Sequence, residues 1–177
     1  MAEIWVVGGD DRVRELTRHL GAQWIEETGS GLNEALSDGI KAADKAGLGS
    51  LYLPADLPFL RPSDIVALLT ASEDGSRLAL APAQRDGGTN AMLVPARSGF
   101  GPLLGEDSFR RHTDLAQRLG MLYAVCDSPG FALDLDTPAD LKRCEEIEPG
   151  FLVRLTGPAD LPAGIAPESM LGLPGDD

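Results

Sequence analysis

The sequence predicts an α/β domain in which helices cover both faces of a largely parallel sheet. Short apolar runs of strand length alternate along the chain with amphipathic segments of helix length, a pattern typical of βαβ units. The 177 residues suffice for one domain with a substantial core. The composition, 43% hydrophobic and 24% charged, is ordinary for a globular protein.

The first predicted elements are two strands and two helices. Residues 4–7 form an apolar run that ends in a Gly-Gly-Asp-Asp turn, which is typical of a buried strand. Asp11 is the predicted cap of a helix with one apolar face, which stops at Gly21. Residues 22–25 are a second strand, and apolar residues at helical spacing predict a helix over residues 32–47.

The middle of the chain contains three further strands. Residues 50–53 form an apolar strand that Pro54 closes, and Ser63 is the predicted cap of the following helix. Residues 78–82 and 90–94 are strands joined by a glycine-bearing loop. In such alternating chains the sheet is mostly parallel, and its strands are buried on both faces.

The last predicted elements lead into a tail. A helix begins at Ser108, residues 121–126 and 131–135 are strands, and a final helix starts at Pro138. The stretch over residues 149–177 is rich in Pro and Gly and shows no clear period. We therefore expect one α/β domain over residues 1–148 and a C-terminal tail over residues 149–177.

The charge balance excludes several classes of function. Fifteen Lys and Arg residues face 28 Asp and Glu residues, a formal net charge of −13. A general nucleic-acid binder needs a basic surface, and an anionic membrane repels such a chain. Phosphorylated substrates stay open, because divalent cations can screen carboxylates from phosphate.

Other sequence features favour a cytoplasmic protein. No apolar run reaches the length of a membrane span, and the N-terminus has no basic region before a long apolar stretch. Cys126 and Cys144 stand alone without a CxxC spacing, so neither a disulfide framework nor a zinc site is expected. The cysteines are typical of a reducing compartment.

Acidic residues follow two of the predicted strands. Asp56 comes after residues 50–53 between two prolines that stiffen its loop, and Asp134 and Asp136 share one face of an extended segment. Carboxylates at the carboxyl ends of strands point into the ligand crevice of such sheets, and Mg²⁺ prefers carboxylates with phosphate oxygens. Each also has a plain structural interpretation: Asp56 as a turn residue or cap, and Asp136 or Thr137 as the cap of the next helix.

Three glycine-bearing loops carry short polar side chains. Asp86-Gly87-Gly88-Thr89-Asn90 could form an anion nest or a simple hairpin turn. Gly105 to Ser108 precedes a helix whose N-terminus suits a phosphate or a carboxylate, or is an ordinary serine cap. Gly31 and Asn33 stand at another helix start, where they could contact a nucleotide or simply form a loop and a cap.

Taken together, these segments resemble the CofC family, the 2-phospho-L-lactate or phosphoenolpyruvate guanylyltransferases of coenzyme F(420) biosynthesis, which are relatives of the molybdenum-cofactor guanylyltransferases. The resemblance covers roughly residues 4–141. Each motif alone is weak, but their shared order is fairly specific. The motifs are Gly31-Leu32-Asn33, Pro54-Ala55-Asp56-Leu57-Pro58, Gly87-Gly88-Thr89-Asn90, Ser108-Phe109-x-x-His112 and Asp134-Leu135-Asp136-Thr137-Pro138-Ala139-Asp140-Leu141.

The resemblance implies a fold and a reaction. The fold is a three-layer, nucleotide-diphospho-sugar-transferase-like domain with a mostly parallel sheet. The reaction is a Mg²⁺-dependent transfer of GMP from GTP to a phosphorylated three-carbon acid, with release of pyrophosphate. The implied acceptors are 2-phospho-L-lactate, phosphoenolpyruvate or 3-phosphoglycerate. Such chemistry needs positioning and charge neutralisation more than an acid–base pair.

The resemblance also implies site residues. Asp56 and Asp136 look like the catalytic metal carboxylates, with Asp134 the second choice for the latter. Contacts to the phosphorylated acid are implied for Thr89, Gly105 and Ser108, with Asn90 adjacent. Part of the guanosine pocket is implied for Gly31 and Asn33. No role is expected for His19 or His112, which are lone histidines on predicted helices.

One departure from the family pattern is large. Members begin with a strand, a lysine-containing loop that grips the triphosphate, and a helix, before the strand that residues 4–7 resemble. We expect these elements to be absent here, through a late start codon or a genuine N-terminal truncation, since no lysine precedes Lys41. Losing the central strand would expose a sheet edge and favour a homo-oligomer.

The same departure leaves two alternatives to the guanylyltransferase. One is a non-catalytic relative that acts as a binding or interaction protein on the same fold. The other is a nucleotidyltransferase for a different acceptor, such as molybdopterin.

Overall fold

The structure is a computed structural model that describes residues 3–8, 10–26 and 31–156. It divides into two compact units, Met1–Asp134 and Leu135–Asp177. The first unit carries all the strands found among the described residues, and the second carries two helices.

The first unit begins with a parallel strand pair, β1 (Trp5–Val7) and β2 (Gln23–Ile25). The helix α1 (Asp11–His19) connects the two strands, as the alternating pattern predicts. Its cap is Asp10, whose side chain accepts hydrogen bonds of 3.0 Å from two backbone N–H groups in the first turn. The prediction that Asp11 caps this helix is therefore wrong by one residue, because Asp11 already has helical geometry.

A four-stranded sheet forms the centre of the first unit, in the order β3-β5-β4-β6. Its strands are β3 (Ser50–Tyr52), β4 (Leu78–Pro82), β5 (Thr89–Val94) and β6 (Tyr123–Val125). β5 is antiparallel to both of its neighbours, whereas β4 and β6 are parallel. The short connection over residues 83–88 explains this, because only an antiparallel partner can be reached by so short a turn.

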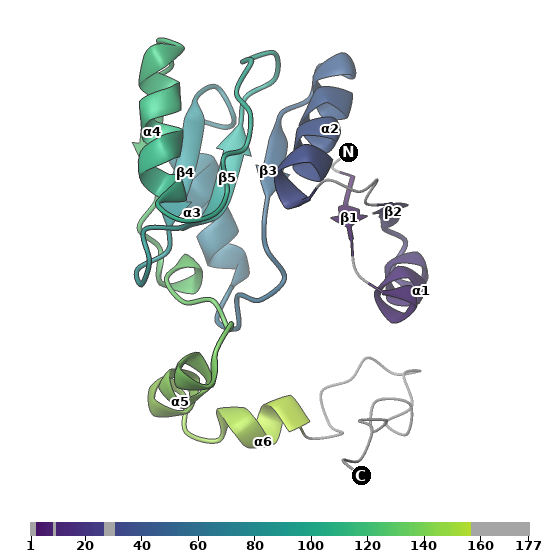
Figure 1. Cartoon of the computed structure of the whole chain (residues 1–177), viewed down its shortest axis with the longest axis vertical. Helices are drawn as coiled ribbons and strands as arrows, with labels where there is room; N and C mark the ends of the chain where they lie inside the picture. The colour runs from purple at the N-terminus through teal and green to yellow at the C-terminus, as the bar shows by residue number, and fades with distance from the viewer. Residues whose placement is uncertain (1–2, 9, 27–30, 157–177) are drawn as a thin grey trace. The chain divides into compact units, whose positions relative to one another are not determined.

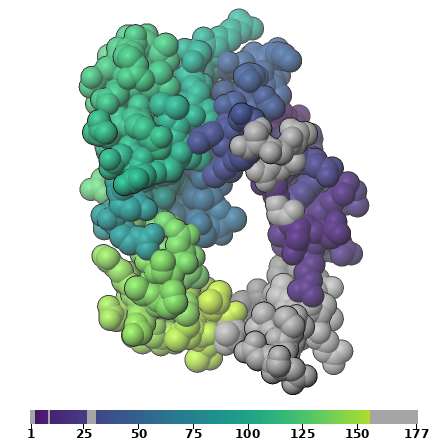
Figure 2. Space-filling view, viewed as in Figure 1, coloured from purple at the N-terminus to yellow at the C-terminus, as the bar shows by residue number. Residues whose placement is uncertain are grey.

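Two helices, α2 (Leu32–Lys45) and α4 (Ser108–Arg118), cover one face of this sheet (Figure 1). Figure 2 shows α4 at the surface of this face, in the upper left of the view. The buried strand residues alternate with a period of two, so this face receives every second side chain of β4 and β5. The residues of the cluster on this face are Ile40, Leu78, Leu80, Met92, Val94, Phe100 and Ala116.

The other face of the sheet is covered by α3 (Pro62–Ala71) and the short 3-10 helix η1 (Pro129–Phe131). Helices on both faces give the three layers that the sequence predicts. The residues of the cluster on this second face are Leu57, Leu68, Ala79, Ala81, Ala91, Leu93, Cys126 and Phe131.

A buried carboxylate holds the start of α3. Asp64 accepts a 2.7 Å hydrogen bond from the backbone N–H of Arg61, and further bonds from the Ser128 hydroxyl and the Gly130 N–H. Burial opposes ionisation of Asp64, but these hydrogen bonds outweigh it, so its pKa lies below the ordinary value. The prediction that Ser63 caps this helix is wrong, because Ser63 lies within the first turn.

The predicted strand over residues 131–135 is also wrong. Phe131, its first residue, is the last residue of η1, and residues 132–135 pair with no strand of the described part of the chain. Phe131 and Leu133 are buried, which explains the apolar pattern that favours a strand. The backbone N–H of Gln84 donates 3.2 Å to the carbonyl of Ala132, an isolated contact without a ladder.

The second unit contains α5 (Pro138–Ile147) and α6 (Phe151–Thr156), which pack against each other. Thr137 caps α5, as one of the two sequence interpretations has it, and Phe151 is buried. The second unit begins at Leu135, which is earlier than the predicted domain boundary after Glu148. That domain boundary stays a prediction. None of the described helices is long and apolar enough to cross a membrane.

Candidate active site

Several predicted site residues gather at one edge of the four-stranded sheet. Thr89, the first residue of β5, lies opposite Pro82, the last residue of β4, because the two strands are antiparallel. This edge is therefore where β3, β4 and β6 end, and Asp56 follows β3 at the same edge. In sheets of this kind ligands bind beyond the carboxyl ends of the parallel strands.

Thr89 is held by two side chains from α4. The Oγ1 of Thr89 lies 2.9 Å from Nδ1 of His112, and the Ser108 hydroxyl donates to the same oxygen over 3.2 Å. Ser108 and His112 are four residues apart, so they share one helix face. All three residues are buried. The structure therefore joins two of the predicted acceptor contacts, Thr89 and Ser108, in one hydrogen-bonded group.

The protons in this group can be assigned from chemistry. The backbone N–H of Leu103 donates to Nε2 of His112 over 2.8 Å, so Nε2 is an acceptor and Nδ1 carries the hydrogen. Nδ1 therefore donates to Thr89. Burial, and then the charge of Arg111, lowers the pKa of His112 to about 4. The ring is neutral near pH 7.

The hydrogen bonds leave Thr89 as a donor. Its oxygen accepts from both His112 and Ser108, so its own hydroxyl hydrogen is left for a third group, and an oxyanion is a suitable acceptor. No role was expected for His112, so the sequence-based prediction missed this residue. Its four-residue spacing from Ser108 is the signal that could have found it.

The loop before α4 is fastened to α2. Both polar atoms of the Asn33 side-chain amide bond the backbone of Leu104: Nδ2 donates to the carbonyl over 3.0 Å, and Oδ1 accepts from the N–H over 2.7 Å. Gly105 follows with a φ of +117°, which favours glycine, and its carbonyl accepts from Ser108 N–H over 3.0 Å. Asn33 thus positions the acceptor loop. Its predicted place in a guanosine pocket, with Gly31 as the N-cap position of α2, stays a prediction.

The glycine turn before Thr89 is a hairpin connection. Asp86 accepts from Gly88 N–H over 2.9 Å, and Ala83 N–H donates 3.0 Å to the carbonyl of Gly88. The carbonyl of Gly87 accepts from the backbone N–H of Phe109 over 3.0 Å, so this turn also holds the start of α4. The hairpin interpretation of this motif is therefore confirmed.

Asn90 has its amide directed at a neighbouring element. Nδ2 donates 2.8 Å to the carbonyl of Phe131 in η1, and the side chain is buried. This bond ties β5 to η1. The predicted contact of Asn90 with an acceptor stays a prediction.

The three predicted metal carboxylates lie in different surroundings. Asp56 is exposed, and together with burial it raises the pKa of Tyr52 to about 12, burial being the larger cause. Asp134 is 8% exposed and lies 3.7 Å from the guanidinium of Arg85. Asp56 belongs to the first unit and Asp136 to the second. The shared metal site of these residues stays a prediction.

The donor chemistry at the sheet edge fits a Mg²⁺ ion. Among residues 3–8, 10–26 and 31–156, no group of three or more His, Cys, Asp or Glu side chains is arranged to hold a metal. A Mg²⁺ ion that takes most of its ligands from phosphate oxygens and water needs only one or two carboxylates. Asp56, exposed at the ligand edge, is a carboxylate of that kind.

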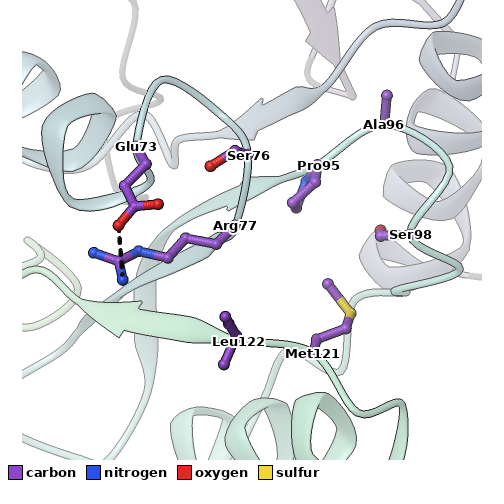
Figure 3. A pocket seen from close by; sticks show the side chains of 8 residues that line it. All are labelled: Glu73, Ser76, Arg77, Pro95, Ala96, Ser98, Met121 and Leu122. Atoms are coloured by element: carbon purple, nitrogen blue, oxygen red, sulfur yellow. Dashed lines mark ion pairs between the residues drawn. The ribbon is translucent and has the colours of Figure 1, made fainter.

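A cleft of about 360 Å³ lies at the opposite edge of the sheet, beside the starts of β4 and β6 and the end of β5 (Figure 3). Its cation, Arg77, is already paired with Glu73 at 3.2 Å and donates 2.8 Å to the carbonyl of Ala71. Because the cleft lies at the opposite ends of these strands, it is separate from the candidate active site. The lining residues are Glu73, Ser76, Arg77, Pro95, Ala96, Ser98, Met121 and Leu122.

Solved structures share the fold of this chain at low sequence identity. A protein from Desulfovibrio desulfuricans G20, assigned as a nucleotide-diphospho-sugar transferase, superposes with a TM-score of 0.61 at 18% identity, over 84% of this chain and 69% of that one. 4-Diphosphocytidyl-2C-methyl-D-erythritol synthase superposes with a TM-score of 0.55 at 14% identity, over 83% and 81%. These likenesses confirm the predicted nucleotide-diphospho-sugar-transferase-like fold.

Curated relatives are considerably closer in sequence. A phosphoenolpyruvate guanylyltransferase of Rubrobacter xylanophilus is 39% identical over 82% of this chain and 71% of its own length. A 3-phospho-D-glycerate guanylyltransferase of Phenylobacterium zucineum is 39% identical over 77% and 64%, and a 2-phospho-L-lactate guanylyltransferase of Methanocaldococcus infernus is 32% identical over 78% and 62%.

The family model described as "Guanylyl transferase CofC like" matches residues 1–146, a range that includes every residue of the hydrogen-bonded group at the sheet edge. The resemblance inferred from the five motifs is thereby confirmed. The chain belongs to the CofC-like guanylyl transferase family.

Proposed function

We propose that this protein transfers GMP from GTP to a phosphorylated three-carbon acid and releases pyrophosphate. The observation that carries the proposal is the buried Thr89–Ser108–His112 group. It presents a hydroxyl donor at the edge of the sheet where ligands bind, within the family match. An oxyanion of such an acid can accept a hydrogen bond from this hydroxyl.

The reaction consists of one displacement at phosphorus. An oxygen of the acceptor's phosphate attacks the α-phosphorus of GTP, and a new P–O bond forms there. The bond between the α-phosphorus and the oxygen that bridges to the β-phosphate breaks, and pyrophosphate leaves with that electron pair. The product joins the acid to GMP through a diphosphate linkage. No acid–base pair is required, so positioning and charge neutralisation carry the catalysis.

The chain's own residues divide this work. Thr89, Gly105 and Ser108 bind and orient the acid, and Gly31 and Asn33 border the nucleotide. Asp56 and Asp136, with Asp134 as the alternative to the latter, would hold Mg²⁺. When bound, this ion neutralises the charge that develops on the phosphate oxygens. These roles are the ones that the resemblance to the CofC family implies for the matching residues.

The acceptor class follows from what the relatives share. The three relatives above are named for phosphoenolpyruvate, 3-phospho-D-glycerate and 2-phospho-L-lactate. Each of these acids carries a phosphate and a carboxylate on a three-carbon skeleton. We propose this class for the present protein, and the place in coenzyme F(420) biosynthesis stays a prediction.

The test is a direct assay for pyrophosphate. The full chain is incubated with Mg²⁺, GTP and each of the three acids in turn, and pyrophosphate release is followed. We expect release with at least one acid and none when the acid is omitted. A further arm replaces the acid with molybdopterin. Release in this arm alone would refute the proposed acceptor class and favour the other acceptor, and release in no arm would refute the proposal and favour the non-catalytic alternative.

The cytoplasmic location remains a prediction as well. Cys126 and Cys144 are both free, as is typical of cysteines in a reducing compartment.

A further inference from the structure

An arginine beside the acceptor loop has no anionic partner among the residues that the structure describes. Arg111 lies in the first turns of α4 and is half-buried. A methyl group placed on Gly105 would lie 3.2 Å from Nη2 of Arg111, so the guanidinium rests directly against the predicted acceptor loop. The Nε of Arg111 is buried and makes no hydrogen bond in the structure.

The neighbouring arginine shows the contrast. Arg110 is 70% exposed and lies 4.0 Å from Asp107 and 3.7 Å from Asp114. Arg111 forms no such ion pair with any carboxylate of the described part of the chain, although the protein carries 28 acidic residues. A guanidinium that is partly removed from water without a partner costs free energy, which a bound anion would offset.

We infer that Arg111 binds an oxyanion group of the acceptor acid, next to the Thr89 hydroxyl. The helix places Ser108, Arg111 and His112 at positions i, i+3 and i+4, so all three lie on one side of α4. That side also meets Gly105 and Thr89. This inference rests on the proposed function, since it names a binding residue of the same site.

The guanidinium suits this task by its shape. Its planar fork donates two parallel hydrogen bonds to a carboxylate or a phosphate, and its charge is constant over the working pH range. The acceptor acids carry both kinds of oxyanion, and the structure assigns to Arg111 the chemistry that the two share. Analogues that carry only a carboxylate or only a phosphate show which of the two groups Arg111 binds.

The kinetic test uses neighbouring arginines as variant and control. Arg111→Gln should raise the KM for phosphoenolpyruvate roughly 10- to 100-fold, the range for loss of a charge-assisted hydrogen bond pair, with the KM for GTP nearly unchanged. Arg111→Lys should lie between, because it keeps the charge but loses the fork. Arg110→Gln removes an exposed charge of the same helix and should change neither KM. Equal effects of Arg111→Gln and Arg110→Gln would overturn the inference.

A binding measurement keeps the inference testable without turnover. In the wild-type protein, the Nε–H resonance of Arg111 is followed by NMR while phosphoenolpyruvate, pyruvate or glycerol 2-phosphate is added. A saturable shift with pyruvate assigns the carboxylate, and one with glycerol 2-phosphate assigns the phosphate. No shift with phosphoenolpyruvate would overturn the inference. A shift without pyrophosphate release in any assay would instead support the Arg111 site and refute the proposed reaction.

Discussion

At the scale of single residues, the direction of one hydroxyl group decides what the candidate site can bind. Thr89 accepts hydrogen bonds from both His112 and Ser108, and this leaves only its hydrogen for a ligand. A hydroxyl with free rotation could serve anions and donors alike. The neutral ring of His112 therefore makes the site selective for acceptors of hydrogen bonds, such as carboxylate and phosphate oxygens.

Thr89→Val tests this arrangement. Valine keeps the shape but removes the hydroxyl, so kcat/KM for the acid should fall roughly 10- to 100-fold. The change also leaves buried donors on Ser108 and His112 unsatisfied, which should lower the free energy of unfolding by about 1–3 kcal/mol. Steady-state kinetics and urea unfolding measure the two effects. Thr89→Ser, which retains the hydroxyl, is the control, and a Ser variant as impaired as the Val variant would contradict the role of the hydroxyl.

Asp56→Asn tests the proposed metal carboxylate. Removing the charge should lower kcat roughly 100- to 1,000-fold, because charge on the phosphate oxygens would no longer be neutralised there. The same change should lower the pKa of Tyr52 from its value of about 12, while burial keeps it above 10. Pyrophosphate release and absorbance titration report these two effects separately. Asp74→Asn, an exposed carboxylate after α3, should change neither, and full activity of Asp56→Asn would remove Asp56 from the mechanism.

The depressed pKa of His112 predicts a loss of stability in mild acid. The unfolded ring binds a proton below about pH 6.5, whereas the folded ring resists protonation until about pH 4. Stability contributed by the neutral ring is thus present above pH 6.5 and is lost as the pH falls toward 4, by at most ~3 kcal/mol.

His112→Asn measures that contribution. Asparagine can still donate toward Thr89 but does not titrate, so the fall in the urea midpoint between pH 7 and pH 4.5 should be smaller in the variant than in the wild type. Asp64 and the other carboxylates are present in both proteins and cancel in the comparison. An unchanged fall would show that His112 does not titrate in this range.

At the scale of elements, α3 is joined to η1 by a close backbone approach. A methyl group on Gly130 would overlap the carboxylate of Asp64, which no packing tolerates. Asp64 in turn accepts hydrogen bonds from the N–H of Arg61, the residue before α3, and from the N–H of Gly130 within η1. The glycine is therefore required for contact between the two elements rather than for backbone flexibility.

Gly130→Ala should consequently lower the free energy of unfolding by about 2–3 kcal/mol, as overpacking in a buried site does. Gly101→Ala is the matched control, because a methyl group there meets nothing within 4 Å. The control should be neutral within about 0.5 kcal/mol. Chemical unfolding of both variants makes the comparison, and equal stability of the two would rule out the close approach.

The elements also show what sequence patterns can and cannot predict. Continuous apolar runs predicted β4 and β5, because the side chains of those strands are buried on both faces of the sheet. The run over residues 131–135 is also rich in apolar residues, but among the described residues it pairs with no strand. Burial alone does not make a strand. Caps were misplaced by one or two residues: a local pattern does not distinguish Asp10 from Asp11, and the start of α3 is held by Asp64, whose partners Ser128 and Gly130 are distant in the sequence.

The candidate site shows the same division. Gly105, Ser108 and Thr89 could be named from the sequence because their motifs occur in an ordered set. Arg111 could not, because its role depends on the absence of a facing carboxylate among the described residues. For His112 the sequence offers only the four-residue spacing from Ser108, since the backbone N–H that fixes its ring comes from the preceding loop. Pairing between distant segments is the information that a single sequence lacks.

At the scale of the whole molecule, exposed strand edges and net charge act against each other. β3 and β6 are the outer strands of the four-stranded sheet, each with one side that pairs with no other strand of the described residues. Leu51 in β3 is 38% exposed. Such edges favour pairing between copies. The net charge of −13 repels a second copy, and the Debye length shrinks from about 30 Å at 0.01 M salt to about 10 Å at 0.1 M.

Self-association should therefore increase with salt. Light scattering is expected to give a mass near that of one chain, 18.7 kDa, at 0.01 M salt, and a larger mass at 0.5 M, where repulsion is screened. Leu51→Lys places a cation on the edge strand and should suppress the increase. Leu69→Lys makes the same chemical change at a residue of similar exposure, 39%, on helix α3, and should leave the increase intact. A single-chain mass at every salt concentration would show that the edges are protected, and equal suppression by both variants would show that association depends on general hydrophobicity instead of strand pairing.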